Sequence, residues 1–236
     1  MKLLTPLPLI ALVGITTVAS QAATLIDDFS GSLTNYTNTV ILDANGGANN
    51  TASWQISGGG LQLNTTAWNG IQQAAYTYNG LSLLVGQELQ VDITSNTASQ
   101  DLGLYVGGTL PVAGVRQDYV AIYARGSNSF IYSRGFDGTT EYALAGPNVA
   151  VTYTSLFIAR TATNTYELGY YNGVTRNLVT TRTPTTANDA EFVGFYSDVR
   201  AVGTLGTLDN LRVVPEPSAV LLGGIGLLGL LRRRRG

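Results

Sequence analysis

The sequence of 236 residues contains no cysteine and no histidine. Without these residue types the chain cannot form disulfides, thiolate nucleophiles or zinc sites made of cysteine and histidine. It also lacks the most common general acid–base side chain, so a Ser-His-Asp triad is excluded. The absence of cysteine does not identify the compartment, because a domain of this size folds without disulfides.

Charged residues are scarce, at 12% of the chain against about 25% in average soluble proteins. Lysine occurs only at Lys2, and residues 23–214 carry eight arginines and fourteen carboxylates, a net charge of about −6. Phosphate binding needs a clustered basic face, so we expect no nucleic-acid partner.

The N-terminus has the pattern of a secretory signal peptide. Lys2 is followed by an apolar stretch from Leu3 to Val18, and Ser20 and Ala22 place small residues three and one positions before a cleavage site. We therefore assign residues 1–22 to a signal peptide. The alternative is an N-terminal membrane anchor or a core helix, which Pro6 and Pro8 disfavour.

The C-terminus combines three elements in order. Pro215, Glu216 and Pro217 precede thirteen uncharged residues, Ala219 to Leu231, and these precede Arg232, Arg233, Arg234 and Arg235. As a helix, the apolar stretch would cover about 20 Å of a bilayer core about 30 Å thick. We expect a short transmembrane helix that spans only transiently, with the arginines held on the cytoplasmic side.

This tail closely resembles the PEP-CTERM sorting domain of Gram-negative bacteria. The resemblance covers residues 213–236 and implies processing by an exosortase, a membrane cysteine protease. It also implies an inner-membrane-anchored precursor, then a cell-surface or extracellular protein, in a host that makes exopolysaccharide or biofilm. The alternative is a plain C-terminal anchor with a positive-inside flank.

Between the two ends, residues 23–212 predict an all-β domain. Short apolar or alternating runs are separated by turn pairs such as Asn172-Gly173 and Asp137-Gly138, which we interpret as hairpin turns with both central residues at positive φ. One expected hairpin joins Thr165–Tyr171 to Val174–Val179, and another has its turn at Arg134–Gly138. No long run shows a helical period, which favours an antiparallel β-sandwich or jelly roll.

Three stretches resemble the concanavalin A-like lectin/glucanase superfamily: Asp27-Asp28-Phe29 with Trp54 and Gly58–Leu61, the hairpin Thr165–Gly173, and Leu208–Val213. The resemblance implies that the first and last strands are neighbours in the sheet, and modules of this shape commonly bind carbohydrate. From the number of strands and the Asn-Gly turns we expect Phe29 and Leu211 to be buried. The alternative is a different all-β sandwich.

Glycosidases of that superfamily carry Glu-x-Asp-x-x-Glu on one strand, because one carboxylate attacks while another protonates from about 5 to 5.5 Å away. This chain lacks the pattern. Its nearest pair, Glu88 and Asp92, is interpreted as part of a solvated strand face. We therefore expect no enzymatic activity.

Aromatic residues provide the candidate ligand site. Tyr119 and Tyr123 share one face of a predicted strand, and exposed aromatic faces commonly pack against sugar rings. Tyrosine is also favoured in half-buried strands, which is the structural alternative. Trp54 and Trp68 are interpreted as core residues.

Asp28 and Asp209 lie in the expected first and last strands. Together with backbone carbonyls, their carboxylates are candidate ligands of a structural calcium ion, which related sandwiches often bind where these strands meet. The alternative is an aspartate that stabilises a strand-end turn.

The sequence thus predicts an exported, non-enzymatic β-sandwich with a structural or binding role at the cell surface or in the matrix. A lectin-like carbohydrate-binding module is the alternative, and a glycan-active enzyme with unrecognised residues is the third class. The expected partners are an exosortase, polysaccharide and, through the tail, the membrane.

Overall fold

The alternating runs fold into fifteen β-strands, without a helix, in the part of the chain that the computed structural model describes. These described residues are 22–44, 52–96, 101–126, 129–147 and 149–215, and all fall in one compact unit, Ala22–Ser218. The expectation of an all-β antiparallel sandwich is confirmed.

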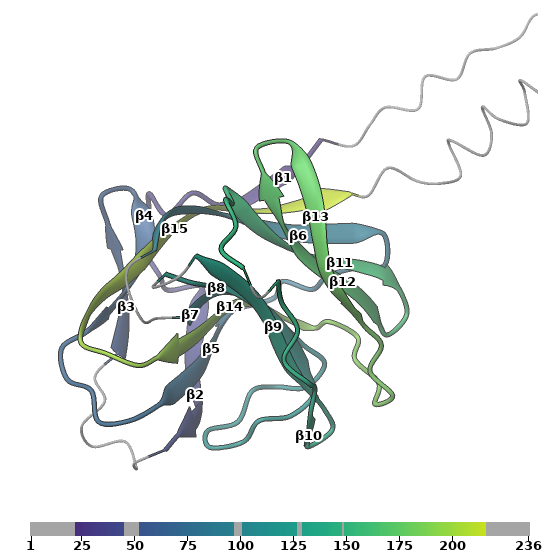
Figure 1. Ribbon diagram of the computed structural model, residues 1–236, viewed down its shortest axis with the longest axis horizontal. Helices are drawn as coiled ribbons and strands as arrows, with labels where there is room; N and C mark the ends of the chain where they lie inside the picture. Colours follow the sequence, from purple (N-terminus) through teal and green to yellow (C-terminus); the bar gives the residue numbers. More distant parts are fainter. Residues whose placement is uncertain (1–21, 45–51, 97–100, 127–128, 148, 216–236) are drawn as a thin grey trace, which may run out of the picture. The chain divides into compact units, whose positions relative to one another are not determined.

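The strands form two antiparallel sheets (Figure 1). The eight-stranded sheet has the order β13-β12-β11-β6-β15-β4-β3, with β1 also paired to β15. Its strands are β1 (Thr24–Asp27), β3 (Ala52–Ser57), β4 (Gly60–Thr65), β6 (Gln87–Asn96), β11 (Ser155–Ala162), β12 (Thr165–Asn172), β13 (Thr175–Arg182) and β15 (Gly203–Pro215). The seven-stranded sheet has the order β10-β9-β8-β7-β14-β5-β2. Its strands are β2 (Tyr36–Asp43), β5 (Gln72–Tyr78), β7 (Asp101–Gly107), β8 (Tyr119–Arg125), β9 (Phe130–Asp137), β10 (Thr140–Glu141) and β14 (Phe192–Val199).

The main core lies between the two sheets. Because side chains alternate along a strand, Leu104 on β7 and Ile122 on β8 point inward and meet Leu89 on β6 and Ile158 on β11 from the other sheet. All four are fully buried. Burial of this apolar layer stabilises a domain that has no cysteine with which to form disulfides.

The first and last strands are neighbours, as expected. Thr24 of β1 pairs with Val213 of β15, and Phe29 and Leu211 are both fully buried. Strand β15 continues to Pro215, so it extends three residues beyond the expected end of the domain at residue 212. The C-terminal motif therefore begins inside a paired strand.

The hairpin β12–β13 is confirmed, but its turn is not the one predicted. Asn172 pairs with Thr175, so the central residues are Gly173 and Val174 rather than Asn172 and Gly173. Among these residues only Gly173 has positive φ, at 60°, which is the pattern of a type II′ turn with glycine first. The type I′ interpretation was wrong.

The hairpin β9–β10 also differs from the prediction. The turn was expected at Arg134–Gly138, but β9 continues to Asp137, which pairs with Thr140. Arg134 pairs with Ala121 of β8 and is a strand residue. Cross-strand pairing overrides the local turn tendency of this segment, and it places Arg134 on a sheet face.

No helix in the described part of the chain is long and apolar enough to cross a membrane. The expected C-terminal helix, Glu216, Pro217 and the arginines Arg232, Arg233, Arg234 and Arg235 lie outside the described residues, as do residues 1–21 of the expected signal peptide.

We predict that core leucines and exposed leucines differ sharply in their contribution to stability. Leu211→Ala should lower the free energy of unfolding by about 2–5 kcal/mol, because it leaves a cavity in the core. Leu25→Ala is the matched control: Leu25 is 54% exposed on the neighbouring strand β1, and its truncation should cost at most about 0.5 kcal/mol. Urea unfolding of both variants measures the difference, and equal costs would contradict the assigned core.

Candidate functional site

The outer face of the seven-stranded sheet is also buried, and it carries a layer of aromatic and charged side chains. Tyr119 and Tyr123 of β8 point to this face, away from the main core. Their rings contact other rings of the layer: Tyr119 lies 5.1 Å from Tyr105 and Tyr123 lies 5.4 Å from Tyr196, centroid to centroid. We call this layer the tyrosine–arginine face; it comprises Gln73, Asp101, Tyr105, Tyr119, Tyr123, Arg125, Tyr132, Arg134, Phe136, Tyr196, Asp198 and Arg200.

A loop between β7 and β8 contributes to this burial. The N–H of Gly114 in this loop donates to the carbonyl oxygen of Val40 on β2, at 3.0 Å. Strands β7 and β8 are central in the sheet, whereas β2 is at its edge. Because the inner face is filled by the other sheet, residues 108–117 reach β2 across the outer face.

Two fully buried carboxylates lie side by side in this layer. Asp101 on β7 pairs directly with Asp198 on β14. The guanidinium of Arg125 donates to both oxygens of Asp101, at 2.6 and 2.7 Å. Burial raises the pKa of Asp101, and the hydrogen bond from Arg125 opposes that rise.

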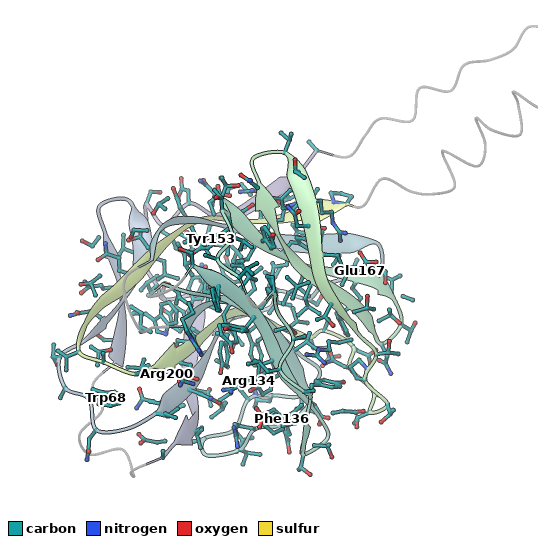
Figure 2. The ribbon with its side chains drawn as sticks, in the orientation of Figure 1. Trp68, Arg134, Phe136, Tyr153, Glu167 and Arg200 are labelled. Atoms are coloured by element: carbon teal, nitrogen blue, oxygen red, sulfur yellow. The ribbon has the colours of Figure 1, made fainter. Side chains whose placement is uncertain are left out.

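Asp198 is held by three groups from different parts of the sheet. Its Oδ2 accepts from Arg200 at 2.8 Å, from Gln73 at 3.1 Å and from Arg134 at 3.3 Å. Arg134 comes from β9, two strands beyond β7, and pairs with Ala121 of β8. Figure 2 labels Arg134 and Arg200 near each other in the lower half of the view, with Phe136 below them.

Several polar atoms of the face are buried without a hydrogen-bond partner among the described residues. They include the hydroxyls of Tyr119, Tyr123 and Tyr196, Oε1 of Gln73 and Oδ1 of Asp198. Buried polar groups are almost always satisfied in folded proteins, and each unsatisfied one costs about 1–3 kcal/mol. Each of these atoms can form a further hydrogen bond, to water or to another hydroxyl group.

The structure places the predicted residues Tyr119 and Tyr123 on one face, but both are buried rather than exposed. The charged residues around them were missed. Arg134 was assigned to a turn, and Asp101 and Asp198 lie far apart in sequence, so only the strand pairing brings them together. In β7, Asp101, Gly103 and Tyr105 alternate with two leucines and a valine that face the main core. This alternation is the local sequence signal for a second layer on the opposite face.

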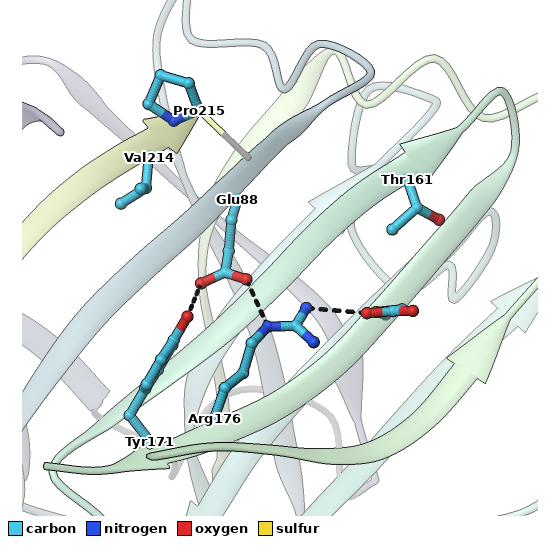
Figure 3. Close-up of a pocket in the computed structure, with 7 residues that line it drawn as sticks. Glu88, Thr161, Tyr171, Arg176, Val214 and Pro215 are labelled. Carbon is cyan, nitrogen blue, oxygen red and sulfur yellow. Dashed lines mark hydrogen bonds and ion pairs between the residues drawn. The ribbon is translucent and has the colours of Figure 1, made fainter. Parts of the chain in front are cut away.

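The outer face of the eight-stranded sheet contains a cavity of about 360 Å³ at the end of β15 (Figure 3). We call it the strand-end cavity; its lining residues are Glu88, Thr161, Glu167, Tyr171, Arg176, Val214 and Pro215. Burial and the neighbouring carboxylate of Glu88 raise the pKa of Tyr171 to about 12, so its hydroxyl remains a donor at neutral pH.

Glu88 corrects the interpretation of a solvated strand face, because it is only 4% exposed. Its carboxylate accepts hydrogen bonds from the hydroxyl of Tyr171 at 2.8 Å and from Nε of Arg176 at 3.0 Å. Arg176 also pairs with Glu167 at 2.9 Å and stacks 4.0 Å above the ring of Phe157. Side chains from β12 and β13 therefore cover a carboxylate that the strand pattern alone places in solvent.

The two candidate calcium ligands are engaged locally. Oδ1 of Asp28 accepts hydrogen bonds from the backbone and hydroxyl of Ser30, and Oδ1 of Asp209 accepts from the N–H of Asn210. The described residues contain no group of three acidic side chains that could hold a metal. Asp28 follows β1 directly and fits turn stabilisation, whereas Asp209 lies inside β15 at a register shift.

The two tryptophans differ. Trp54 packs against the main core, with its ring stacked 4.8 Å from that of Tyr76. Trp68 is 43% exposed, and Figure 2 shows it at the margin of the molecule, so its assignment to the core was wrong. Trp68 lies in the connection between β4 and β5, so the alternation of side chains along a strand does not determine whether it faces the core or solvent.

Comparison with known proteins identifies the tail and the fold. Residues 213–235 match the family described as "PEP-CTERM protein-sorting motif", and the chain therefore carries a sorting signal of exported proteins. No curated protein matches the sequence.

Solved structures share the fold at low sequence identity. The VIP36 exoplasmic/lumenal domain in its Ca²⁺/Man3GlcNAc-bound form is 12% identical, with a TM-score of 0.51 over 81% of this chain and 87% of that chain. The β-glucanase of Bacillus licheniformis is 13% identical, with a TM-score of 0.52 over 82% of this chain and 98% of that one. The domain thus has a β-sandwich fold similar to that of these two proteins, in agreement with the fold that the sequence resemblance implied.

We predict that Arg125 stabilises the fold by neutralising Asp101. Arg125→Ala should lower the free energy of unfolding by about 3–5 kcal/mol at neutral pH, because it leaves a buried carboxylate without its main partner. The raised folded pKa of Asp101 means that the folded state binds the proton more tightly than the unfolded state. The loss should therefore shrink as the pH falls through the raised pKa of Asp101, above the ordinary aspartate value of about 3.9, because the folded state then carries a neutral Asp101.

Arg116→Ala is the control for this measurement. Its pairing with Glu141 spans 3.9 Å, and both side chains are partly exposed, so its loss should cost about 1 kcal/mol or less. Denaturant unfolding across pH tests both variants. A cost for Arg125→Ala that grows on acidification would show that Asp101 is not the group that Arg125 neutralises.

Proposed function

We propose that this protein is exported by a Gram-negative bacterium, processed by an exosortase-type membrane enzyme, and binds polysaccharide at the cell surface or in the matrix without cleaving it. The observation that carries the binding role is the group of unpartnered polar atoms in the tyrosine–arginine face. Sugars present many hydroxyls that both donate and accept, next to apolar ring faces that pack on aromatic rings. Oδ1 of Asp198, Oε1 of Gln73 and the tyrosine hydroxyls match that chemistry.

Access to this layer is best where the arginines meet solvent. The side chains of Arg125 and Arg200 are 23% and 31% exposed, whereas the carboxylates beneath them are at 0%. A glycan that enters on this side meets guanidinium groups first, and these bind hydroxyl and carboxylate oxygens alike. VIP36, which has a similar fold, was solved with Man3GlcNAc, so the fold is compatible with a glycan ligand.

The same charges argue against hydrolysis. A retaining or inverting glycosidase needs one carboxyl that gives up a proton and a second that attacks or activates water. Asp101 is chelated by Arg125, and Asp198 is held by Arg200, Arg134 and Gln73. These donors occupy both oxygens of Asp101 and Oδ2 of Asp198, which disfavours either carboxyl as a catalytic acid or a nucleophile. Release of reducing sugars from a bound glycan would overturn this part of the proposal.

We predict that Tyr123→Phe separates binding from stability. The lost hydroxyl has no partner among the described residues, so the free energy of unfolding should stay the same or rise slightly. Affinity for a polysaccharide selected on a glycan array should fall about tenfold, or about 1.4 kcal/mol. Calorimetry and urea unfolding measure the two effects.

Tyr36→Phe is the control with the opposite pattern. The hydroxyl of Tyr36 donates to Asp27 at 3.1 Å on the core side of the sheet. Its loss should cost about 0.5–1.5 kcal/mol of stability and leave glycan affinity unchanged. If no polysaccharide on the array binds, or if Tyr123→Phe binds like the wild type, the proposed face is not a glycan site.

We predict that the sorting motif controls processing. Changing Pro215, Glu216 and Pro217 together to alanine should leave export intact and trap the uncut precursor in the inner membrane. The prolines oppose helix continuation and favour the extended backbone that a protease engages. Fractionation and intact mass in a host that carries the exosortase measure this. If the triple variant is cleaved and released like the wild type, the motif acts only as a spacer and the prediction is wrong.

A further inference from the structure

The sorting segment begins inside the folded domain. Val213, Val214 and Pro215 belong both to the matched family segment and to β15, where they pair with Leu89, Glu88 and Gln87 of β6. Val213 is 6% exposed and packs in the main core. No spacer residue therefore separates the sheet from the Pro-Glu-Pro motif.

The strand that leads to the motif is firmly held. The guanidinium of Arg212 donates to Gln90 at 2.9 Å and to Asp92 at 2.8 Å, both on β6. Strand β1 pairs with β15 as far as Val213, and within the described part of the chain Val214 and Pro215 pair with β6 alone. The position from which the chain leaves the sheet is fixed by these contacts.

Chain geometry then limits how far the motif can be from the domain surface. Consecutive Cα atoms are about 3.8 Å apart, so the backbone of Glu216 and Pro217 starts within about 8 Å of Pro215. Pro215 and Val214 form one wall of the strand-end cavity, and Figure 3 shows Thr161 on the side opposite to them. The first motif residue, Pro215, is therefore itself part of the cavity wall.

We propose that the rim of the strand-end cavity is a docking surface for the membrane enzyme that processes the tail. This inference rests on the proposed exosortase processing and adds a second recognition element to it. The cavity of about 360 Å³ can receive a side chain of the partner. Glu167 and Arg176 are 31% and 33% exposed at its edge and offer a carboxylate and a guanidinium for polar contacts. Recognition then includes the folded domain as well as the motif.

The test compares cleavage rates of precursor variants in a host that carries the processing enzyme. Thr161→Arg places a bulky charged side chain on the rim and should slow cleavage about tenfold. Thr39→Arg is the matched control, since Thr39 is a half-buried strand threonine like Thr161 but lies on β2 of the other sheet. It should be cleaved at the wild-type rate. Thermal unfolding of each purified domain shows that both variants fold.

A spacer of six glycine and serine residues between Val214 and Pro215 provides the second arm. It moves the motif by up to roughly 20 Å from the rim. The spacer alone should slow cleavage about tenfold, and adding Thr161→Arg to it should change nothing further, because the two changes remove the same contact. Additive effects, or faster cleavage with the spacer, would overturn the docking surface.

The alanine variant of the motif distinguishes the two proposals. If that variant is blocked while Thr161→Arg is cleaved at the wild-type rate, the enzyme reads the motif alone and only the docking surface fails. If the alanine variant is itself processed normally, the exosortase assignment fails as well.

Discussion

The pairing of β15 with β6 is the interaction on which the rest of the structure depends. This last strand runs through the middle of the eight-stranded sheet, with β6 on one side and β4 and then β1 on the other. Its buried residues Leu208 and Leu211 enter the main core, and its partner strand carries Glu88 on the outer face. The first and last strands meet where β1 pairs with the other side of β15, and β15 also leads into the sorting motif.

The scarcity of charge has a structural counterpart. Only 12% of the residues in the chain are charged, and many of them form networks on the outer faces of the two sheets. On the seven-stranded sheet the network joins Asp101 and Asp198 to Arg125, Arg134 and Arg200. On the eight-stranded sheet it joins Glu88 and Glu167 to Arg176. Arginine suits such sites because its planar guanidinium bonds two partners at once and stays charged. A domain that uses arginine alone can therefore bury carboxylates that lysine would satisfy less well.

The sequence predicted well whatever depends on local pattern. The strand segments, the β12–β13 hairpin, the burial of Phe29 and Leu211 and the pairing of first and last strands all follow from alternation, turn residues and resemblance. The candidate site could be predicted only in part. Tyr119 and Tyr123 were placed on one face correctly, but their burial depends on the loop that reaches Val40 and on Arg134, whose strand position contradicts its local turn signal.

The misses at the two sites share one physical cause, which is that pairing between distant strands decides what covers a sheet face. Asp101 and Asp198 are 97 positions apart in the numbering yet directly opposite in the sheet, and Glu88 is covered by Tyr171 and Arg176 from a later hairpin. The two sites that result lie on outer faces of different sheets, with the main core between them. In the proposed function this separation matters, because a glycan held on the seven-stranded sheet does not occupy the surface on which the processing enzyme would act.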